Sequence, residues 1–221
     1  MQEPDEDMLL DPVDNEPLGP RARRISTEVG AVPGLTAFER ALVLARRLHE
    51  HQARKGTTIP YIAHLMAVAA IVLEDGGSEA QAIAALLHDA PEDQGSMAAL
   101  EEIRLLFGDV VATIVESLTD SFEHPKPPWR ERKVRYIERL GEEPITVLQV
   151  SLADKVHNAT AIVRDLEAHG PVLWGRFNEG AEGQLWYYRS LAEVLWARLP
   201  GPRSAELRRL VDRMEELHAG G

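Results

Sequence analysis

Apolar side chains recur at steps of three and four residues along most of the chain, a spacing that predicts amphipathic helices. Thr36 and Glu39 have the spacing of a capping box, in which each of the two side chains accepts the backbone N–H of the other residue. Ser78 and Gln81 repeat that spacing before a second apolar stripe. The stripe after Thr36 comprises Phe38, Ala41, Leu42, Ala45 and Leu48. The sequence therefore predicts a helix start at each box.

The later two thirds of the chain continue the same helical period, interrupted by glycines that end helices. Gly108, Gly141 and Gly170 each follow an apolar stripe. Strand-like alternation and hairpin turn signals are missing from the sequence. The predicted helices are Met97–Phe107, Val110–Leu118, Trp129–Leu140, Ile145–Ala168, Gly183–Leu199 and Arg203–His218. We predict an all-α fold of about eight to ten helices joined by short loops.

Charge is unevenly distributed along the 221 residues, whose formal net charge is −12. Residues 1–20 contain acidic side chains and no basic one, and prolines interrupt this segment repeatedly. We predict that residues 1–34 form an acidic, disordered or loosely docked arm and that residues 35–221 form one domain. The arm could serve solubility or bind a basic partner.

Composition excludes several classes of function. The chain has no cysteine, so disulfides, thiolate metal sites and cysteine nucleophiles are excluded. No apolar run approaches the length of about 20 residues that a membrane span needs. The acidic start is unlike a signal peptide, which predicts a cytoplasmic protein. The net negative charge also argues against nucleic acid as a partner.

Polar residues that interrupt apolar helices indicate where chemistry occurs, because a buried charge requires a partner. In the segment AIAALLHDAPED, six apolar residues lead directly into His88 and Asp89. Adjacent side chains point about 100° apart on a helix, yet both can reach one metal ion at the helix end. Imidazole nitrogen with carboxylate oxygen suits manganese, iron or zinc. The pair alone is also compatible with ordinary polar contacts.

Two further segments show the same interruption. His64 ends the segment PYIAH and leads into another apolar stretch, and Asp154 interrupts VLQVSLADKVHN. Asp154, His157 and Asn158 share one helix face because they are three and four residues apart. Taken singly, His64 could be a hydrogen-bonded core histidine and Asp154 could pair with an arginine. Their order along the chain, with His88 and Asp89 between them, is more specific than any one of them.

This order resembles the ligand pattern of the HD-domain metal phosphohydrolases. Within that family, the segments ARKGTTIPYIAH, LLHDAPEDQG, FGDVVATIVESLTD and VSLADKVHN resemble the hydrolase domain of RelA/SpoT-type alarmone enzymes. In size the chain is similar to small stand-alone alarmone hydrolases of the metazoan SpoT type. The resemblance runs from Leu42 to Leu195 and implies an HD-domain helical bundle without a synthetase domain. Leu65 and Pro91 depart from the family's usual residues, and neither is a presumed ligand.

The resemblance also implies roles for individual residues. Mn²⁺, or another divalent metal, would be held by His64, His88, Asp89 and Asp154. Glu92 and Asp93 would orient the attacking water and handle its protons; alternatively, they only complement a helix dipole. The residues assigned to substrate binding are Arg54, Lys55, Asn158, Arg176 and Tyr188.

These substrate assignments differ in their basis. Arg54 and Lys55 match a basic pair that borders the nucleotide base in relatives, where a guanidinium can stack on a purine. The aromatic spacing around Tyr188 is also typical of core packing. A second basic cluster could contact phosphate or be a solvated helix face; it comprises Lys126, Arg130, Arg132 and Lys133.

The resulting prediction is a manganese-dependent hydrolase that removes the 3′-pyrophosphate from (p)ppGpp and yields GDP or GTP. Its partner would be a nucleotide, a small molecule. One alternative is the same chemistry on another phosphorylated nucleotide, such as an adenosine alarmone or the 2′-phosphate of NADPH. A further alternative is a non-catalytic nucleotide sensor that signals through its acidic arm. The sequence leaves the oligomeric state open, a dimer being one option.

Overall fold

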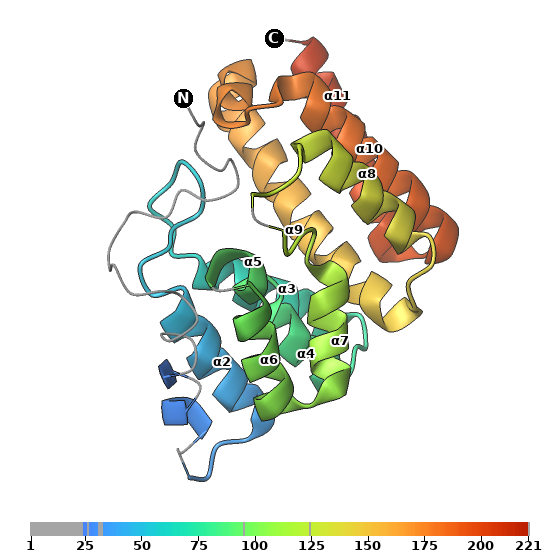
Figure 1. The fold of residues 1–221 in the computed structure, drawn as a ribbon. Helices are drawn as coiled ribbons and strands as arrows, with labels where there is room; N and C mark the ends of the chain where they lie inside the picture. Colours follow the sequence, from blue (N-terminus) through green and yellow to red (C-terminus); the bar gives the residue numbers. More distant parts are fainter. Residues whose placement is uncertain (1–23, 26, 31–32, 95, 124, 221) are drawn as a thin grey trace. The chain divides into compact units, whose positions relative to one another are not determined.

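The computed structural model describes residues 24–25, 27–30, 33–94, 96–123 and 125–220 (Figure 1). The chain separates into two compact units, residues 1–127 and residues 128–221, and each is described by itself. The predicted domain of residues 35–221 therefore contains the boundary between them. Residues 1–23 of the predicted arm lie outside the described residues.

The last part of the predicted arm is helical at residues 24–25 and 27–30. Ile25 and Val29 are buried there, and Glu28 pairs with Arg47 at 2.7 Å. The burial shows that these residues are packed into the first unit, as a docked segment would be.

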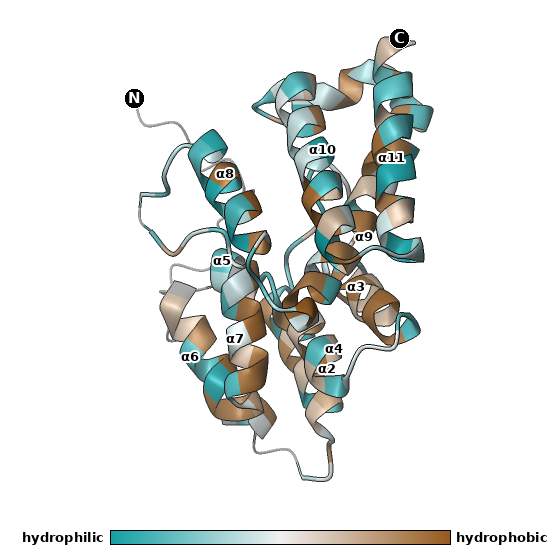
Figure 2. Cartoon of the chain, turned by 90° about the vertical axis from the view of Figure 1, so that its right-hand side faces the viewer, coloured by the Kyte–Doolittle hydropathy of each residue, from teal (hydrophilic) through white to brown (hydrophobic). Residues whose placement is uncertain are grey.

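The first unit is built around α4, which packs against α2, α3 and α7. Every residue from Gln81 to Leu87 is buried, because a helix that is apolar on all sides requires neighbours on all sides. Figure 2 shows hydrophobic residues along most of α3 and α7. The helices are α2 (Ala37–Leu48), α3 (Ile62–Glu74), α4 (Glu79–Leu87), α5 (Ala90–Gln94), α6 (Ser96–Phe107) and α7 (Asp109–Leu118).

Both predicted capping boxes are present. The N–H of Glu39 donates to Thr36 Oγ1 at 3.3 Å, and the N–H of Thr36 donates to Glu39 Oε2 at 2.7 Å. Ser78 and Gln81 make the same reciprocal pair at the start of α4. Gly108 separates α6 from α7 with φ 84°, a backbone conformation that side-chain-bearing residues rarely adopt.

The second unit packs α9 against α11, and α10 contacts α8, α9 and α11. Gly170, with φ 68°, ends α9 and starts a short 3-10 helix that the sequence pattern did not predict. The elements are α8 (Trp129–Leu140), α9 (Ile145–His169), η1 (Gly170–Arg176), α10 (Gly180–Arg198) and α11 (Pro202–Ala219).

The all-α prediction is confirmed by helices α2 to α11. Within the described ranges, β-type pairing is limited to an isolated bridge between Ala53 and Pro60. Among the helices described here, none has both the length and the apolar character that crossing a membrane requires.

Candidate metal centre

Two helices that pack on each other bring His64 and His88 together in the first unit. His64 is in the first turn of α3, and His88 directly follows α4. The residues are only 1% and 5% exposed. Their ring centroids lie 5.5 Å apart with an edge-to-face angle of 65°. The two predicted histidines thus form one buried pair.

The hydrogen bond made by His88 selects its tautomer. His88 Nδ1 lies 2.8 Å from the carbonyl oxygen of Ala85, which can only accept, so Nδ1 carries the hydrogen. In the neutral ring the lone pair is then on Nε2. That nitrogen lies 3.1 Å from Asp89 Oδ2. Two acceptors at this distance require a proton or a cation between them. A hydrogen bond from Nδ1 to a backbone carbonyl is typical of a histidine that binds a metal through Nε2.

Asp89 lies in the turn between α4 and α5, and its carboxylate completes the group. Its Oδ2 is 3.6 Å from His64 Nε2 and accepts a hydrogen bond of 2.7 Å from the Tyr61 hydroxyl. Two imidazoles and a carboxylate therefore converge within the first unit. This donor set fits a divalent transition metal better than calcium.

His49 and Tyr61 lie next to this group of side chains, and the sequence pattern predicted no functional role for either. His49 follows α2, is 2% exposed, and stacks on Tyr61 at 5.2 Å between ring centroids. Its Nδ1 donates to Gln52 Oε1 at 2.6 Å. Burial lowers the pKa of His49 to about 4, although the Gln52 hydrogen bond and the Asp89 charge oppose this change. His49 is therefore a neutral ring at physiological pH.

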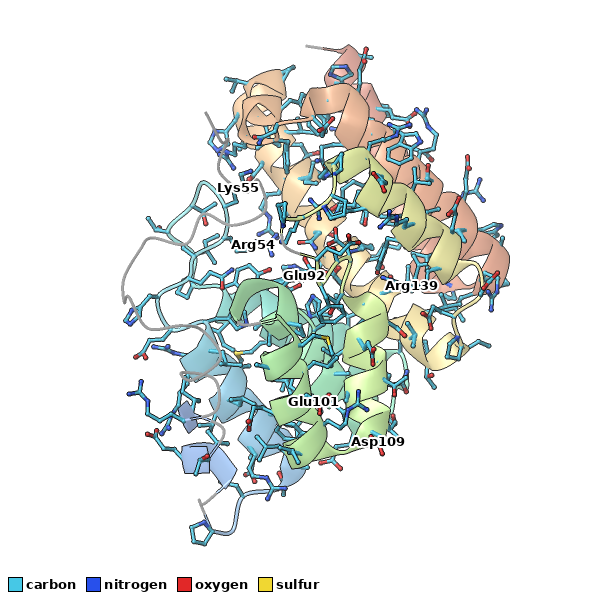
Figure 3. The ribbon with its side chains drawn as sticks, in the orientation of Figure 1. Arg54, Lys55, Glu92, Glu101, Asp109 and Arg139 are labelled. Atoms are coloured by element: carbon cyan, nitrogen blue, oxygen red, sulfur yellow. The ribbon has the colours of Figure 1, made fainter. Side chains whose placement is uncertain are left out.

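Glu92, labelled in Figure 3, lies in α5, three residues after Asp89 in the sequence. Its Oε1 accepts the backbone N–H of Asp120 at 2.7 Å, in the segment that follows α7. This bond fixes the orientation of the Glu92 carboxylate. The side chain of Asp93 lies outside the described residues, so its predicted role stays a prediction.

Arg54 and Lys55 lie on the loop between α2 and α3, called here the basic loop (residues 52–61; Figure 3). The N–H of Arg54 donates to Ile59 O at 2.9 Å, and the N–H of Tyr61 donates to Gln52 O at 2.9 Å. These bonds close the loop. Arg54 is partly exposed and Lys55 is exposed, so both predicted substrate contacts reach solvent.

Asp154 is buried in α9 of the second unit. A buried carboxylate needs partners that compensate for its lost hydration. Lys155 Nζ lies 2.7 Å from Oδ2, and Asn158 Nδ2 donates to Oδ1 at 2.6 Å. Burial by itself lowers the pKa of Lys155, but the Asp154 charge and nearby tyrosines raise it well above its usual value. Lys155 is thus a cationic partner of Asp154, where one alternative from the sequence was an arginine.

Arg176 and Tyr188, two further predicted substrate contacts, lie in the second unit. Arg176 pairs with Asp165 at 2.7 Å, and Tyr188 is 6% exposed within the apolar core. Arg132 of the second basic cluster is buried, and the Arg130 guanidinium lies 3.2 Å from the centroid of the Trp186 ring. Substrate binding by Asn158, Arg176 and Tyr188 stays a prediction.

Comparisons with known proteins place these residues in a family. A family model described as HD domain matches residues 41–175, a range that includes every predicted metal ligand. The chain is 36% identical over 135 residues to a probable guanosine-3′,5′-bis(diphosphate) 3′-pyrophosphohydrolase of Synechocystis sp., covering 60% of this chain and 17% of that relative. The chain thus spans less than a fifth of that relative's length.

Smaller relatives match over most of their length. The guanosine-3′,5′-bis(diphosphate) 3′-pyrophosphohydrolase MESH1 of Xenopus tropicalis is 39% identical over 133 residues, covering 59% of this chain and 69% of that protein. A solved metazoan ortholog of SpoT that hydrolyzes ppGpp aligns with a TM-score of 0.64 and 28% identity, covering 84% of this chain and 97% of the ortholog. The family model matches more than half of the residues of this chain, and the chain therefore belongs to the HD-domain family.

Proposed function

We propose that this protein is a metal-dependent hydrolase that removes the 3′-pyrophosphate from (p)ppGpp, yielding GDP or GTP and pyrophosphate. The observation that carries the proposal is the convergence of His64, His88 and Asp89 in the first unit. The similarity to the MESH1 hydrolases supports the choice of substrate.

The HD-domain family implies a divalent metal, and the residues of this chain fit one. His64, His88 and Asp89 are proposed ligands, because the His88 tautomer leaves an Nε2 lone pair facing the Asp89 carboxylate. Asp154 is the proposed fourth ligand, and Mn²⁺ the proposed metal. When bound, such a cation lowers the pKa of a coordinated water and polarises a phosphate oxygen.

Glu92 is the proposed proton carrier, together with Asp93. The Asp120 N–H anchors one oxygen of Glu92, so the carboxylate is held in one orientation before substrate arrives. In this role it accepts a proton from the attacking water and returns it to the leaving 3′-oxygen of the ribose.

Arg54 and Lys55 are the proposed contacts to the nucleotide at its other end. Their loop is closed by backbone bonds at both ends, which limits the entropy lost when substrate orders it. The Arg54 guanidinium would stack on the guanine, and the Lys55 ammonium would meet phosphate. Asn158, Arg176 and Tyr188 are further proposed contacts.

The test is hydrolysis of ppGpp by the purified protein with Mn²⁺ in oxygen-18 water, with products resolved by chromatography and mass spectrometry. We expect GDP and pyrophosphate, with the label in pyrophosphate because water attacks phosphorus. Release of orthophosphate alone, or turnover of an adenosine alarmone or NADPH in preference to ppGpp, would contradict the proposed substrate. Binding of ppGpp without turnover would identify a sensor instead.

A further inference from the structure

Tyr61 connects the basic loop to the proposed metal centre. Its hydroxyl donates to Asp89 Oδ2 at 2.7 Å, and its backbone N–H donates to Gln52 O at 2.9 Å. Tyr61 also precedes α3, the helix that carries His64. The same residue therefore closes the loop and holds the carboxylate.

The Tyr61 ring is supported from behind. His49 stacks on it with an angle of 24° between the ring planes, and His49 is held in turn by its 2.6 Å bond to the Gln52 side chain. Gln52 thus fixes Tyr61 twice, through its backbone carbonyl and through His49. These contacts restrict where the phenol hydroxyl can point.

We propose that Tyr61, supported by His49 and Gln52, is a positioning residue that holds the Asp89 carboxylate toward His64 and His88 and so raises the affinity for a divalent metal. The inference rests on the proposed function, since it assigns Asp89 to metal. It concerns a hydrogen-bond donor behind a ligand, not a further ligand.

The chemistry of the donor suits this role. A phenol orients a carboxylate by one strong O–H···O bond and leaves its negative charge intact for a cation. Asp154 is held differently, because Lys155 presents a full positive charge to it. Hydrogen-bonding partners of metal ligands typically contribute about 10–100-fold to metal affinity.

A structural role for the Tyr61 ring makes a different prediction from a positioning role. Phenylalanine fills the same space and keeps the stacking on His49, but it cannot donate to Asp89. The substitution Tyr61→Phe therefore removes the proposed interaction and preserves the packing. Tyr187→Phe is the matched control, because it removes a buried tyrosine hydroxyl from the core of the second unit.

The experiment is titration of each metal-free protein with Mn²⁺, with free Mn²⁺ followed by electron paramagnetic resonance. We expect Tyr61→Phe to raise the dissociation constant about 10–100-fold and Tyr187→Phe to leave it unchanged. With Co²⁺ as the probe, the visible absorption bands should shift in Tyr61→Phe only. Wild-type affinity and an unaltered Co²⁺ spectrum in Tyr61→Phe would overturn the inference.

A second variant keeps the test decisive if Tyr61→Phe folds poorly. His49→Phe retains an aromatic ring against Tyr61 but loses the bond to Gln52, and it should weaken Mn²⁺ binding several-fold; unchanged binding would count against the inference.

Failure of the proposed function has a different signature. A wild type that binds Mn²⁺ more tightly than Tyr61→Phe but does not hydrolyse ppGpp would refute the substrate and leave the role of Tyr61 intact.

Discussion

His49 makes the stability of the first unit depend on pH. Burial lowers the pKa of His49 from 6.5 to about 4. Between these values the unfolded chain binds a proton that the folded chain does not, so the free energy of unfolding falls as the pH drops from 6.5 to 4. The expected loss is about 3 kcal/mol, complete near the lower pKa.

Urea unfolding of the metal-free protein across this pH range measures the effect. The control is His49→Asn, which cannot take up the proton and should therefore lose that share of the pH dependence. Curves for wild type and variant that run parallel between pH 6.5 and 4 would contradict the assignment to His49.

An amide substitution should show that Glu92 carries protons and does not bind the metal. In Glu92→Gln the side-chain oxygen can still accept from the Asp120 N–H, but the proton acceptor is gone. We expect wild-type metal content and a decrease in kcat on the order of 10²–10⁴-fold, measured by elemental analysis and steady-state kinetics. Asp93→Asn should behave alike. Loss of metal from either variant would make that residue a ligand instead.

At the scale of single residues, the sequence identified those site residues that are polar and lie within apolar runs. His64, His88 and Asp154 each interrupt an apolar run, and burial of a polar group requires partners. His49 lies in the polar segment LHEHQ at a helix end, where nothing distinguishes a buried histidine from an exposed one. Its burial depends on the return of the chain at Tyr61, which no local pattern encodes.

The Ser78 side chain caps and so stabilises the start of α4. This helix ends at Leu87, directly before His88, and Ser78 Oγ accepts the N–H of Gln81 at its start. Ser78→Ala should lower the free energy of unfolding by about 1 kcal/mol, as measured in urea, because a backbone N–H loses its acceptor. Ser78→Asp is the control, since aspartate also caps; an equal loss in both variants would show that capping is not the cause.

Helices were predictable where a stop or start residue accompanies the apolar period. Trp129–Leu140 has the predicted ends, and α9 extends one residue beyond the prediction before Gly170. The segment η1 was not predicted, because a 3-10 helix lacks the 3.6-residue period that indicates an α-helix. The start of α10 at Gly180 was also missed, because glycine is a poor helix former and gave no reason to extend the helix backward from Gly183.

A bound metal should stabilise the whole protein through mass action. Metal at about a hundredfold excess over its dissociation constant contributes about 2.7 kcal/mol to the free energy of unfolding. We therefore expect Mn²⁺ to raise the melting temperature of the wild type, and a chelator to reverse the rise, as followed by calorimetry. His88→Ala removes one proposed ligand and should show neither change. A melting temperature that responds equally to Mn²⁺ in wild type and His88→Ala would contradict the site.

Division of the chain into two units is the feature that the sequence pattern did not provide. Periodicity tells which face of a helix is apolar, but not which helix covers that face. The division falls in the proline-rich segment between α7 and α8, at Pro127 and Pro128. The single domain of residues 35–221 that the sequence predicts stays a prediction.

The placement of Tyr61 at the end of the basic loop has a thermodynamic consequence. In the proposed function, a nucleotide that orders the loop through Arg54 and Lys55 also restrains Tyr61, which is bonded to Asp89. Occupancy of the two sites is then linked, and linkage is reciprocal: the factor by which metal tightens nucleotide binding equals the factor by which nucleotide tightens metal binding. With the proposed metal and nucleotide, the protein would bind the metal most tightly when the nucleotide is abundant and would release it more readily when the nucleotide is scarce.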